Sequence, residues 1–446
     1  MKTNVPGVIW PPVLLGRHAT IQALVSEFRT TERLDPAELR QAQEMQLGLL
    51  IRHHAQHTPH FKARLAKQSL KASDLSGLQG LRKLDVIRKR DIQMAGPGFT
   101  CSAIPEEHMP CGDVSTSGST GEPVTFQRSA INQLFWEAHV FRDHEWNGRS
   151  FHHNMAAIRA TVDGFGIYET WGNPVGRFYN TGKAMVINVG ETIEFQLEKL
   201  SEFRPGILIA HGGVLQGLVT HWERHGYDLE LAHIKNIGDN CHDELRARIK
   251  AVTGLTVEDN YSSSEAGLIA LQCPEGGQFH IMSETCLVEI LDDRGDPCAP
   301  GEIGHVVLTD LQNFASPIIR YDIGDYAEVG DGCSCGRTLP TLKKIIGRER
   351  NLFHRPDGTR FWPRAGMHEM PKIAPIRQWQ MIQHEIDHVE YRFVVDEPLS
   401  EQQKEKLRDL VPKYLLYKPD KISITEFTDA IPTRNGKYEE TICYIK

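Results

Sequence analysis

The sequence predicts an α/β protein with a large N-terminal part and a small C-terminal α+β unit. Between about residues 110 and 345, strand-like runs such as "PVTFQRS" and "GEIGHVVLTDL" alternate with helical ones through Gly-rich connections. The last hundred residues read as strand, helix and strand, followed by the polar loop "IPTRNGKYEE". The segment "IGRERNLFHRPDGTRFWP", rich in charge and turn residues, separates the two parts. We therefore predict domains over residues 1–347 and 348–446.

Composition narrows the classes of protein to consider. The chain has 446 residues, of which 40% are hydrophobic and 24% charged, as is usual for globular proteins. Its net charge of -8 argues against a nucleic-acid partner. The apolar run near the start is broken by prolines and lacks a cleavage site, so we expect packed N-terminal chain rather than a signal peptide. No stretch has the length of a membrane span. Nine cysteines, an odd number in a large chain, indicate reduced thiols and a cytoplasmic protein.

A helical lead-in covers about residues 1–110, and its clearest helix is predicted over 35–58. Asp35 is the expected N-cap, Pro36 takes the first helical position, and Glu38 would complete a capping box. One face of this helix is expected to carry Leu39, Ala42, Met45 and Leu49. Its end is crowded by His53, His54, His57 and His60. For these histidines a solvated helix end is favoured over a metal site.

The C-terminal unit shows the clearest periodicity. "DHVEYRFVVD" alternates apolar residues on one face, as a half-buried strand does: Val389, Tyr391, Phe393 and Val395. "SEQQKEKLRDLVPKYL" then begins with a capping box of Ser400 and Gln403. Its apolar stripe is expected to be Leu407, Leu410 and Tyr414. "DKISITEF" follows as a second strand.

The stretch "STSGSTGEP" (115–123) consists almost entirely of hydroxyl residues and glycines. It is compatible with a flexible linker or with a phosphate-binding loop, in which glycines expose backbone N–H groups and hydroxyls donate around them. It lacks the lysine of the nucleotide-kinase P-loop. Further polar motifs are "DNYSSSEAG" (259–267), "RYDIGD" (320–325), "GRERN" (347–351) and "TRNGK" (433–437). Each of them alone could be an ordinary turn or strand end.

In order and spacing, these motifs together resemble the core motifs of the adenylate-forming superfamily, which comprises acyl- and aryl-CoA synthetases, adenylation domains and luciferases. The helix ending "HTPHF", the block "SPIIRYDIGD" and "CSCGRTLP" before "IGR" resemble its phenylacetate-CoA ligase branch. The resemblance runs over nearly the whole chain. It implies a large adenylate-forming domain followed by a small mobile domain. It also implies that a carboxylic acid attacks the α-phosphate of Mg·ATP, giving an acyl-adenylate and pyrophosphate, and that a nucleophile then displaces AMP.

The resemblance assigns nucleotide-binding roles residue by residue. It implies a loop over the β- and γ-phosphates made of Ser115, Thr116, Ser117, Gly118, Ser119, Thr120 and Gly121. It places the ring of Tyr261 against adenine, whose edge would meet Gly238, Asp239 and Asn240. Asp325 would accept both ribose hydroxyls, and Arg348 would also reach the ribose.

Catalytic roles follow from the same resemblance. Ser264, where threonine is commoner, would donate to the α-phosphate, and Glu265 would hold Mg²⁺, a cation that prefers carboxylate and phosphate oxygens. Lys437 matches the lysine that the small domain delivers in the first half-reaction, where an ammonium can bridge the acid and the α-phosphate. The chain departs from the pattern at three further places. Ser262 stands where glycine is usual, and Arg350 and Asn351 stand at the hinge, where the branch tends to have aspartates.

Two further sites are less marked. The acid pocket is expected beside "IAHGG" and "NIGDN", with His211 and Gly213 in its wall, although His211 may equally be a satisfied histidine at a strand end. Cys273, His280, Cys333 and Cys335 could complete a tetrahedral Cys₃His set, despite the unfamiliar spacing of each half. Members of the branch carry a similar set, which implies a structural Zn²⁺. The alternative is four unrelated residues.

The function expected from the resemblance is an ATP-dependent acid ligase that passes an aryl or arylacetic acid to CoA. A second interpretation keeps the adenylation and changes the acceptor to an amine or to the thiol of a carrier protein. A third is a degenerate nucleotide-binding regulatory protein, against which the joint presence of Glu265, Asp325 and Lys437 argues. The expected partners are therefore small molecules and an acyl acceptor. The oligomeric state stays open, a homodimer included.

Overall fold

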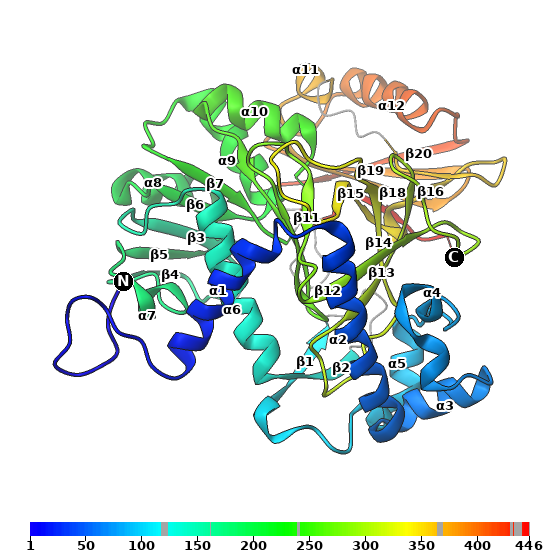
Figure 1. Ribbon diagram of the computed structural model, residues 1–446. Helices are drawn as coiled ribbons and strands as arrows, with labels where there is room; N and C mark the ends of the chain where they lie inside the picture. The colour runs from blue at the N-terminus through cyan, green and yellow to red at the C-terminus, as the bar shows by residue number, and fades with distance from the viewer. Residues whose placement is uncertain are drawn as a thin grey trace.

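The computed structural model describes residues 1–116, 124–160, 162–238, 241–363, 369–428, 431 and 439–445. The lead-in is helical, as the sequence predicts (Figure 1). It contains α1 (Arg17–Thr31), α2 (Pro36–His57), α3 (Pro59–Lys67), α4 (Gly77–Leu81) and α5 (Lys89–Ala95). The hairpin of β1 (Cys111–Thr116) and β2 (Val124–Ser129) follows, and β2 leads directly into α6 (Ala130–Trp146).

A six-stranded sheet forms the first half of the α/β part, in the order β4-β5-β3-β6-β7-β8. Its strands are β3 (Met155–Arg159), β4 (Phe165–Tyr168), β5 (Ala184–Asn188), β6 (Ile207–Ala210), β7 (His233–Asn236) and β8 (Val257–Glu258). All neighbouring pairs are parallel except β4 and β5. The crossovers are α8 (Ile193–Phe203), α9 (Gly212–His225) and α10 (Asp243–Thr253), while the short α7 (Val175–Phe178) lies near α1 (Figure 1).

A seven-stranded antiparallel sheet forms the second half, in the order β12-β13-β14-β15-β11-β10-β9. Its strands are β9 (Asn260–Ser263), β10 (Gly267–Gln272), β11 (Phe279–Ile281), β12 (Cys286–Leu291), β13 (Ile303–Asp310), β14 (Tyr321–Val329) and β15 (Thr341–Arg348). One core joins this sheet to the β1–β2 hairpin, because Val124 and Phe126 pack with Tyr261 and Tyr321. The base of the "STSGSTGEP" loop therefore lies against this sheet.

The chain after residue 352 has a core of its own, which runs from Phe353 to Leu415 and includes Tyr391 and Leu407. Its four-stranded sheet has the order β20-β19-β18-β21. The elements are β16 (Phe353–His354), β17 (Arg360–Phe361), α11 (Met370–Ile373), β18 (Ile376–Glu385), β19 (His388–Val395), α12 (Glu401–Leu415), β20 (Lys421–Phe427) and β21 (Thr441–Cys443). The predicted strand–helix–strand succession is confirmed by β19, α12 and β20, and the capping box of Ser400 and Gln403 is present.

Two details of the predicted helix over 35–58 are wrong. Asp35 does cap α2, but its carboxylate accepts from the N–H of Ala37, and no capping box with Glu38 is formed. Met45 and Leu49 are 67% and 51% exposed, whereas the buried positions are Leu39, Leu47, Leu50, Ile51 and His54. The buried face is therefore turned away from the predicted stripe, because α2 packs on α3, α4 and the loop after β13 rather than on one partner.

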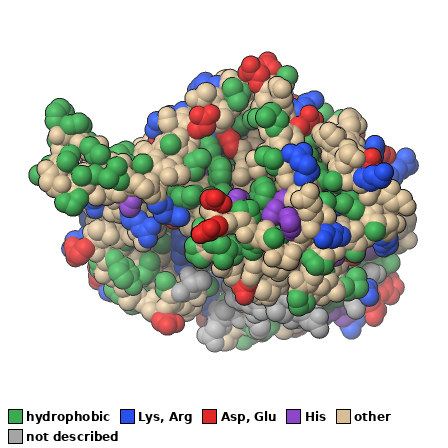
Figure 2. All heavy atoms as spheres, turned by 60° about the horizontal axis from the view of Figure 1, so that its bottom comes forward, with side chains coloured by type: hydrophobic (Ala, Val, Ile, Leu, Met, Phe, Trp, Pro, Cys, Tyr) green, Lys and Arg blue, Asp and Glu red, His purple; other side chains and the backbone are tan. Residues whose placement is uncertain are grey.

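An apolar segment near the N-terminus projects from the body as the dark blue loop of Figure 1. The Asn4 side chain ties the base of this loop to both backbone groups of Leu15. Ile9 and Trp10 are 87% and 86% exposed, so the expectation of a packed N-terminal chain is wrong for this segment. Figure 2 shows apolar side chains gathered on a projection at its left edge. In the described part of the chain, no helix is both long and apolar enough to cross a bilayer.

Candidate active site

The motif "NYSSSEAG" forms a tight antiparallel hairpin, in which β9 and β10 are joined by the turn Ser264–Ala266. The Ser263 hydroxyl accepts a hydrogen bond of 3.2 Å from the N–H of Ala266 and closes the turn. Gly267 then takes a φ of +75°, a conformation that L side chains rarely adopt. This local chemistry places Ser264 exposed at the tip of the turn and Glu265 partly buried beside it.

Tyr261, Asp325 and Arg348 meet across the antiparallel sheet, although they are far apart in the sequence. The Tyr261 hydroxyl donates a 2.8 Å hydrogen bond to Oδ2 of Asp325. Arg348 Nε lies 3.4 Å from the other oxygen, Oδ1. The register of β14 and β15 sets Asp325 opposite Arg348, so the sheet itself brings the two motifs together.

Electrostatic interactions connect Glu265 with Tyr261 and Arg348. Burial raises the pKa of Tyr261 well above its usual value, and the carboxylates of Asp325 and Glu265 raise it further. Burial lowers the pKa of Arg348, but Asp325, Glu439 and Glu265 outweigh it and raise the pKa overall. Several carboxylates thus face one guanidinium, which is a suitable setting for a cation and a nucleotide.

Tyr321 is a site residue that sequence reasoning missed. Its hydroxyl donates a 3.3 Å hydrogen bond to Oε1 of Glu265. Tyr321 is 3% exposed, and its ring belongs to the core under the hairpin. It is the second residue of "RYDIGD", so the motif contained the signal, but only the three-dimensional structure shows that its hydroxyl reaches Glu265.

The predicted acid-pocket residues meet Gly238, the described residue of the expected adenine edge, where the parallel strands end. β6 ends at Ala210, just before His211. The carbonyl of Ala210 accepts a hydrogen bond from the N–H of Ile237, which follows β7. The His211 ring packs on Gly238, where an added Cβ would lie 2.9 Å from Cε1 of that ring. Gly238 also has a φ of +74°, so a side chain there would be strained as well as crowded. Gly213 lies in the first turn of α9, next to this contact.

Several predicted residues fall outside the described part of the chain. These are Ser117 to Gly121 of the phosphate loop, Asp239 and Asn240, and Lys437. Ser115 and Thr116 end β1, and Thr116 pairs with Val124 at the start of β2. The stretch that contains the remaining loop residues therefore connects two paired strand ends.

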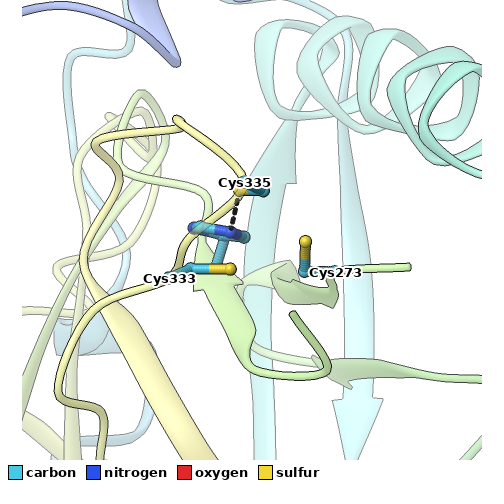
Figure 3. A group of neighbouring side chains, drawn as sticks. Cys273, Cys333 and Cys335 are labelled. Carbon is cyan, nitrogen blue, oxygen red and sulfur yellow. Dashed lines mark hydrogen bonds between the residues drawn. The ribbon is translucent and has the colours of Figure 1, made fainter. Parts of the chain in front are cut away.

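Cys273, His280, Cys333 and Cys335 form one cluster, as Figure 3 shows for the three cysteines. Their candidate ligand atoms all lie within 4.8 Å of one another. Cys273 follows β10, His280 is in β11, and the other two are in the loop between β14 and β15. The Cys335 sulfur lies 3.3 Å from Nε2 of His280, the dashed contact of Figure 3. The structure thus joins the two halves that looked unrelated in the sequence.

The donor chemistry of this cluster fits a zinc ion. Nδ1 of His280 lies 3.2 Å from the carbonyl of Leu339, which leaves Nε2 facing the sulfurs. Backbone N–H groups of Gly276 and Arg337 point at Cys273 and Cys335 at 3.4 and 3.5 Å. Ligands about 2.3 Å from a tetrahedral metal are themselves about 3.8 Å apart, close to the spacing here. Gly276 has no room for a side chain, since a Cβ would lie 2.3 Å from the Cys333 sulfur.

The histidines at the end of α2 do not form the solvated end that the sequence favoured. His54 is fully buried, and its ring lies 2.8 Å from the Thr58 hydroxyl and 2.9 Å from the Asn313 carbonyl. Burial lowers the pKa of His54 to about 3, so the ring is neutral. His53 contacts the Cys101 sulfur and the Phe314 carbonyl, both at 3.1 Å. These histidines anchor α2 on the loop after β13.

Known proteins that are similar to this chain indicate the family that it resembles. No family model matches the sequence. The chain is 25% identical over 384 residues to the phenylacetate-coenzyme A ligase of Thermus thermophilus, covering 82% of this chain and 84% of that protein. It is 27% identical over 339 residues to the Pseudomonas putida enzyme of the same name, covering 72% and 74%. The chain thus resembles the phenylacetate-CoA ligase branch of the adenylate-forming superfamily over most of its length. It is thus an AMP-forming acid ligase.

Solved structures show that the ligase has the fold of this superfamily. The 2-hydroxyisobutyryl-CoA ligase in its postadenylation state matches with a TM-score of 0.72 and 18% identity, covering 93% of this chain and 91% of that one. The same enzyme in its thioesterification state matches with a TM-score of 0.62. The anthranilate CoA ligase AuaEII matches with a TM-score of 0.53 and 15% identity, covering 73% and 65%.

Proposed function

We propose that the enzyme joins a carboxylic acid, in the first instance an aryl or arylacetic acid, to CoA through an acyl-adenylate. The observation that carries this proposal is the group of Tyr261, Asp325, Arg348 and Glu265 at one end of the antiparallel sheet. This group lies on the core that also holds the base of the phosphate loop. The CoA ligases among the similar proteins support CoA as the acceptor, and the phenylacetate and anthranilate in their names support the class of acid.

In the first half-reaction, a carboxylate oxygen of the acid forms a bond to the α-phosphorus of ATP, and the bond to pyrophosphate breaks. Asp325 is placed to accept the ribose hydroxyls, because Tyr261 and Arg348 hold both of its oxygens in a fixed orientation. Glu265, oriented by Tyr321, is the carboxylate suited to bind Mg²⁺, which would neutralise phosphate charge. Ser264 would donate to the α-phosphate from the tip of its turn.

Lys437 is proposed as the ammonium that bridges the acid and the α-phosphate as negative charge develops there. Covalent geometry keeps its Cα within about 11 Å of the Cα of Glu440, three residues later. The negative charge of the neighbouring Glu439 raises the pKa of Arg348, and Arg348 lies beside Asp325. These two relationships support a lysine within reach of the nucleotide. We also propose that residues 348–446 form the mobile domain that delivers it.

In the second half-reaction, the thiol of CoA attacks the acyl carbonyl, and AMP leaves with the oxygen that came from the acid. One alternative stays open: an amine or the thiol of a carrier protein takes the place of CoA as the acceptor. The regulatory alternative without catalysis is not favoured, because the relatives support an AMP-forming acid ligase. A homodimer and a cytoplasmic location also remain proposals.

For the Cys₃His cluster we propose a structural Zn²⁺ that links the β10–β11 connection to the loop between β14 and β15.

The test is acid-dependent exchange of pyrophosphate into ATP across aryl, arylacetic and aliphatic acids. We expect exchange with some of the aryl or arylacetic acids and no exchange without an acid. CoA, amines and a carrier protein, added in turn to the active combination, then identify the acceptor. Exchange with none of the acids, in protein shown to bind ATP, would favour the regulatory alternative.

A further inference from the structure

Segment 439–445 lies between the two parts of the chain in the structure. The carbonyl of Glu440 accepts a 2.8 Å hydrogen bond from the N–H of Met381, and Thr441 pairs with the same residue in the small sheet. The side chain of Glu440 points the other way. Its Oε2 lies 3.0 Å from Nε2 of His242, the residue at the N-cap position of α10 in the six-stranded part of the fold. One residue of the small unit is therefore bonded to its own sheet and to the large part.

His242 and Glu440 flank the two segments that meet the nucleotide in the proposed function. His242 follows Gly238 to Asn240, the expected adenine edge, by two residues, and Glu440 follows Lys437 by three. The Glu440 side chain is 18% exposed and that of His242 is 42% exposed. The exposed part of each side chain lets the ion pair break and form again, and the buried part favours the paired arrangement.

We propose that the His242–Glu440 ion pair is a latch that holds the small domain, and with it Lys437, in the arrangement for adenylation. This inference rests on the proposed function. His242 would be a positioning residue, since it touches no reacting atom and acts through the segment that carries Lys437. Opening the latch would free the small domain for acyl transfer. The better match to a relative's postadenylation state than to its thioesterification state is consistent with a closed latch here.

The charges around His242 make the latch sensitive to pH. Burial lowers the pKa of His242, but Glu440 and Asp243 outweigh burial and the neighbouring Lys344, so the pKa is raised overall. Lys344 on β15 is itself paired with Asp243 at 2.6 Å, within the large part. Because a histidine with a raised pKa is charged below that pKa, the pair is complete at lower pH. It is lost as the pH rises through the raised value.

The first experiment compares the wild type with His242→Gln and Glu440→Gln in both half-reactions. Each variant should slow acid-dependent pyrophosphate exchange by about three- to fivefold near pH 6.5, the range for a partly exposed ion pair. The double variant should be no worse than either single one, because both remove the same bond. Transfer from supplied acyl-adenylate to the acceptor should be unchanged or faster. The control is His152→Gln, which replaces an exposed histidine elsewhere on the molecule.

The pH profile separates a latch from a general structural effect. The rate of pyrophosphate exchange should fall between about pH 6.5 and 8.5 in both the wild type and Glu440→Gln. The fall should be larger in the wild type. His242→Lys keeps the positive charge across this range, so it should retain exchange at the upper pH. Wild-type rates in both single variants over the whole range would overturn the proposal.

A structural measurement keeps this test separate from the proposed function. Hydrogen–deuterium exchange of segment 439–445 in the acid-free protein should be faster in His242→Gln than in the wild type and in His152→Gln. If no acid supports pyrophosphate exchange, the proposed function fails, and the latch is judged on this measurement. Equal protection of 439–445 in the wild type and His242→Gln would then refute it.

Discussion

Asp325 is bonded through both of its carboxylate oxygens, to the Tyr261 hydroxyl at 2.8 Å and to Arg348 Nε at 3.4 Å. A carboxylate fixed in this way needs little reorganisation to accept two further hydroxyls. Pre-organised acceptors bind tightly because less conformational freedom is lost on binding. The same carboxylate links the strand that ends near the turn of Glu265 with the strand that leads into the small unit.

Replacing Asp325 should weaken use of ATP. Hydrogen bonds to a charged group contribute about 1.5–3 kcal/mol each, so Asp325→Asn should lower kcat/KM for ATP by about 10- to 100-fold. Pyrophosphate exchange with varied ATP measures this effect. Tyr261→Phe is the matched control, since it keeps the ring and removes only the hydroxyl bonded to Asp325. A wild-type kcat/KM for ATP in Asp325→Asn would exclude the ribose role.

Lys437→Ala should separate the two half-reactions. Adenylation should fall by about 100- to 1,000-fold, because a charge that meets the developing negative charge is lost. Acyl transfer from supplied acyl-adenylate should survive, since the α-phosphate bond to pyrophosphate is already broken. Rapid-quench measurement of each step checks this. Near-normal adenylation in Lys437→Ala would remove the role given to this residue.

Zinc should stabilise the protein through the cysteine cluster. Protein purified without chelator should contain about one zinc per chain, and Cys273→Ser or Cys335→Ser should lose it and unfold several degrees lower. Cys298→Ser is the control, because Cys298 is partly buried but lies outside the cluster. Metal content well below one zinc per chain, with equal Tm in all four proteins, would count against a structural ion.

Acid should weaken the fold through Glu284. Its side chain is 9% exposed and pairs with Arg142 at 2.7 Å. Burial raises the pKa of Glu284, but Arg142 outweighs burial and lowers the pKa to about 2. A lowered pKa adds stability above the unfolded value of 4.5, and this part is lost as the pH falls toward 2.

Denaturant unfolding at several pH values tests this linkage. The free energy of unfolding of the wild type should fall between about pH 4.5 and 2 by up to about 3 kcal/mol from this group. Glu284→Gln should be less stable at neutral pH, because it leaves Arg142 buried without its charge partner, and should show a shallower fall. Parallel curves for the two proteins would show that Glu284 is not the titrating group.

Periodicity predicted the succession of C-terminal elements well and the buried face of α2 poorly, for a physical reason. The stripe expected on α12 is right only at Leu407, because Val411 and Leu415 are buried in place of Leu410 and Tyr414. On strand β19, Val389, Tyr391 and Phe393 pack in the core of the small unit as expected, although Val394 on the other face is buried as well. Helix α2 contacts several elements at once, so its buried face includes His54 and leaves Met45 exposed. Strands β18 and β21 were not predicted. β21 has only three residues, and its place follows from pairing with β18.

Site residues could be proposed from motifs, but their contacts could not. Tyr261, Asp325 and Arg348 come from three separate motifs. Strand register sets Asp325 opposite Arg348, and a hydrogen bond across the sheet joins Tyr261 to Asp325. The Cys₃His set had unfamiliar spacing in the sequence because its halves are joined across β11 and a loop. The ion pair of His242 with Glu440 has no motif at all, since it depends on how the two parts of the chain are arranged.

The most direct test of acid activation follows an oxygen atom. With the acid labelled by ¹⁸O in its carboxylate, reaction with ATP and the acceptor should give AMP that carries one ¹⁸O, because the acid oxygen that bonds to the α-phosphorus leaves with AMP. Mass spectrometry of the AMP reads this out. Unlabelled AMP, or labelled phosphate accompanied by ADP, would contradict an acyl-adenylate.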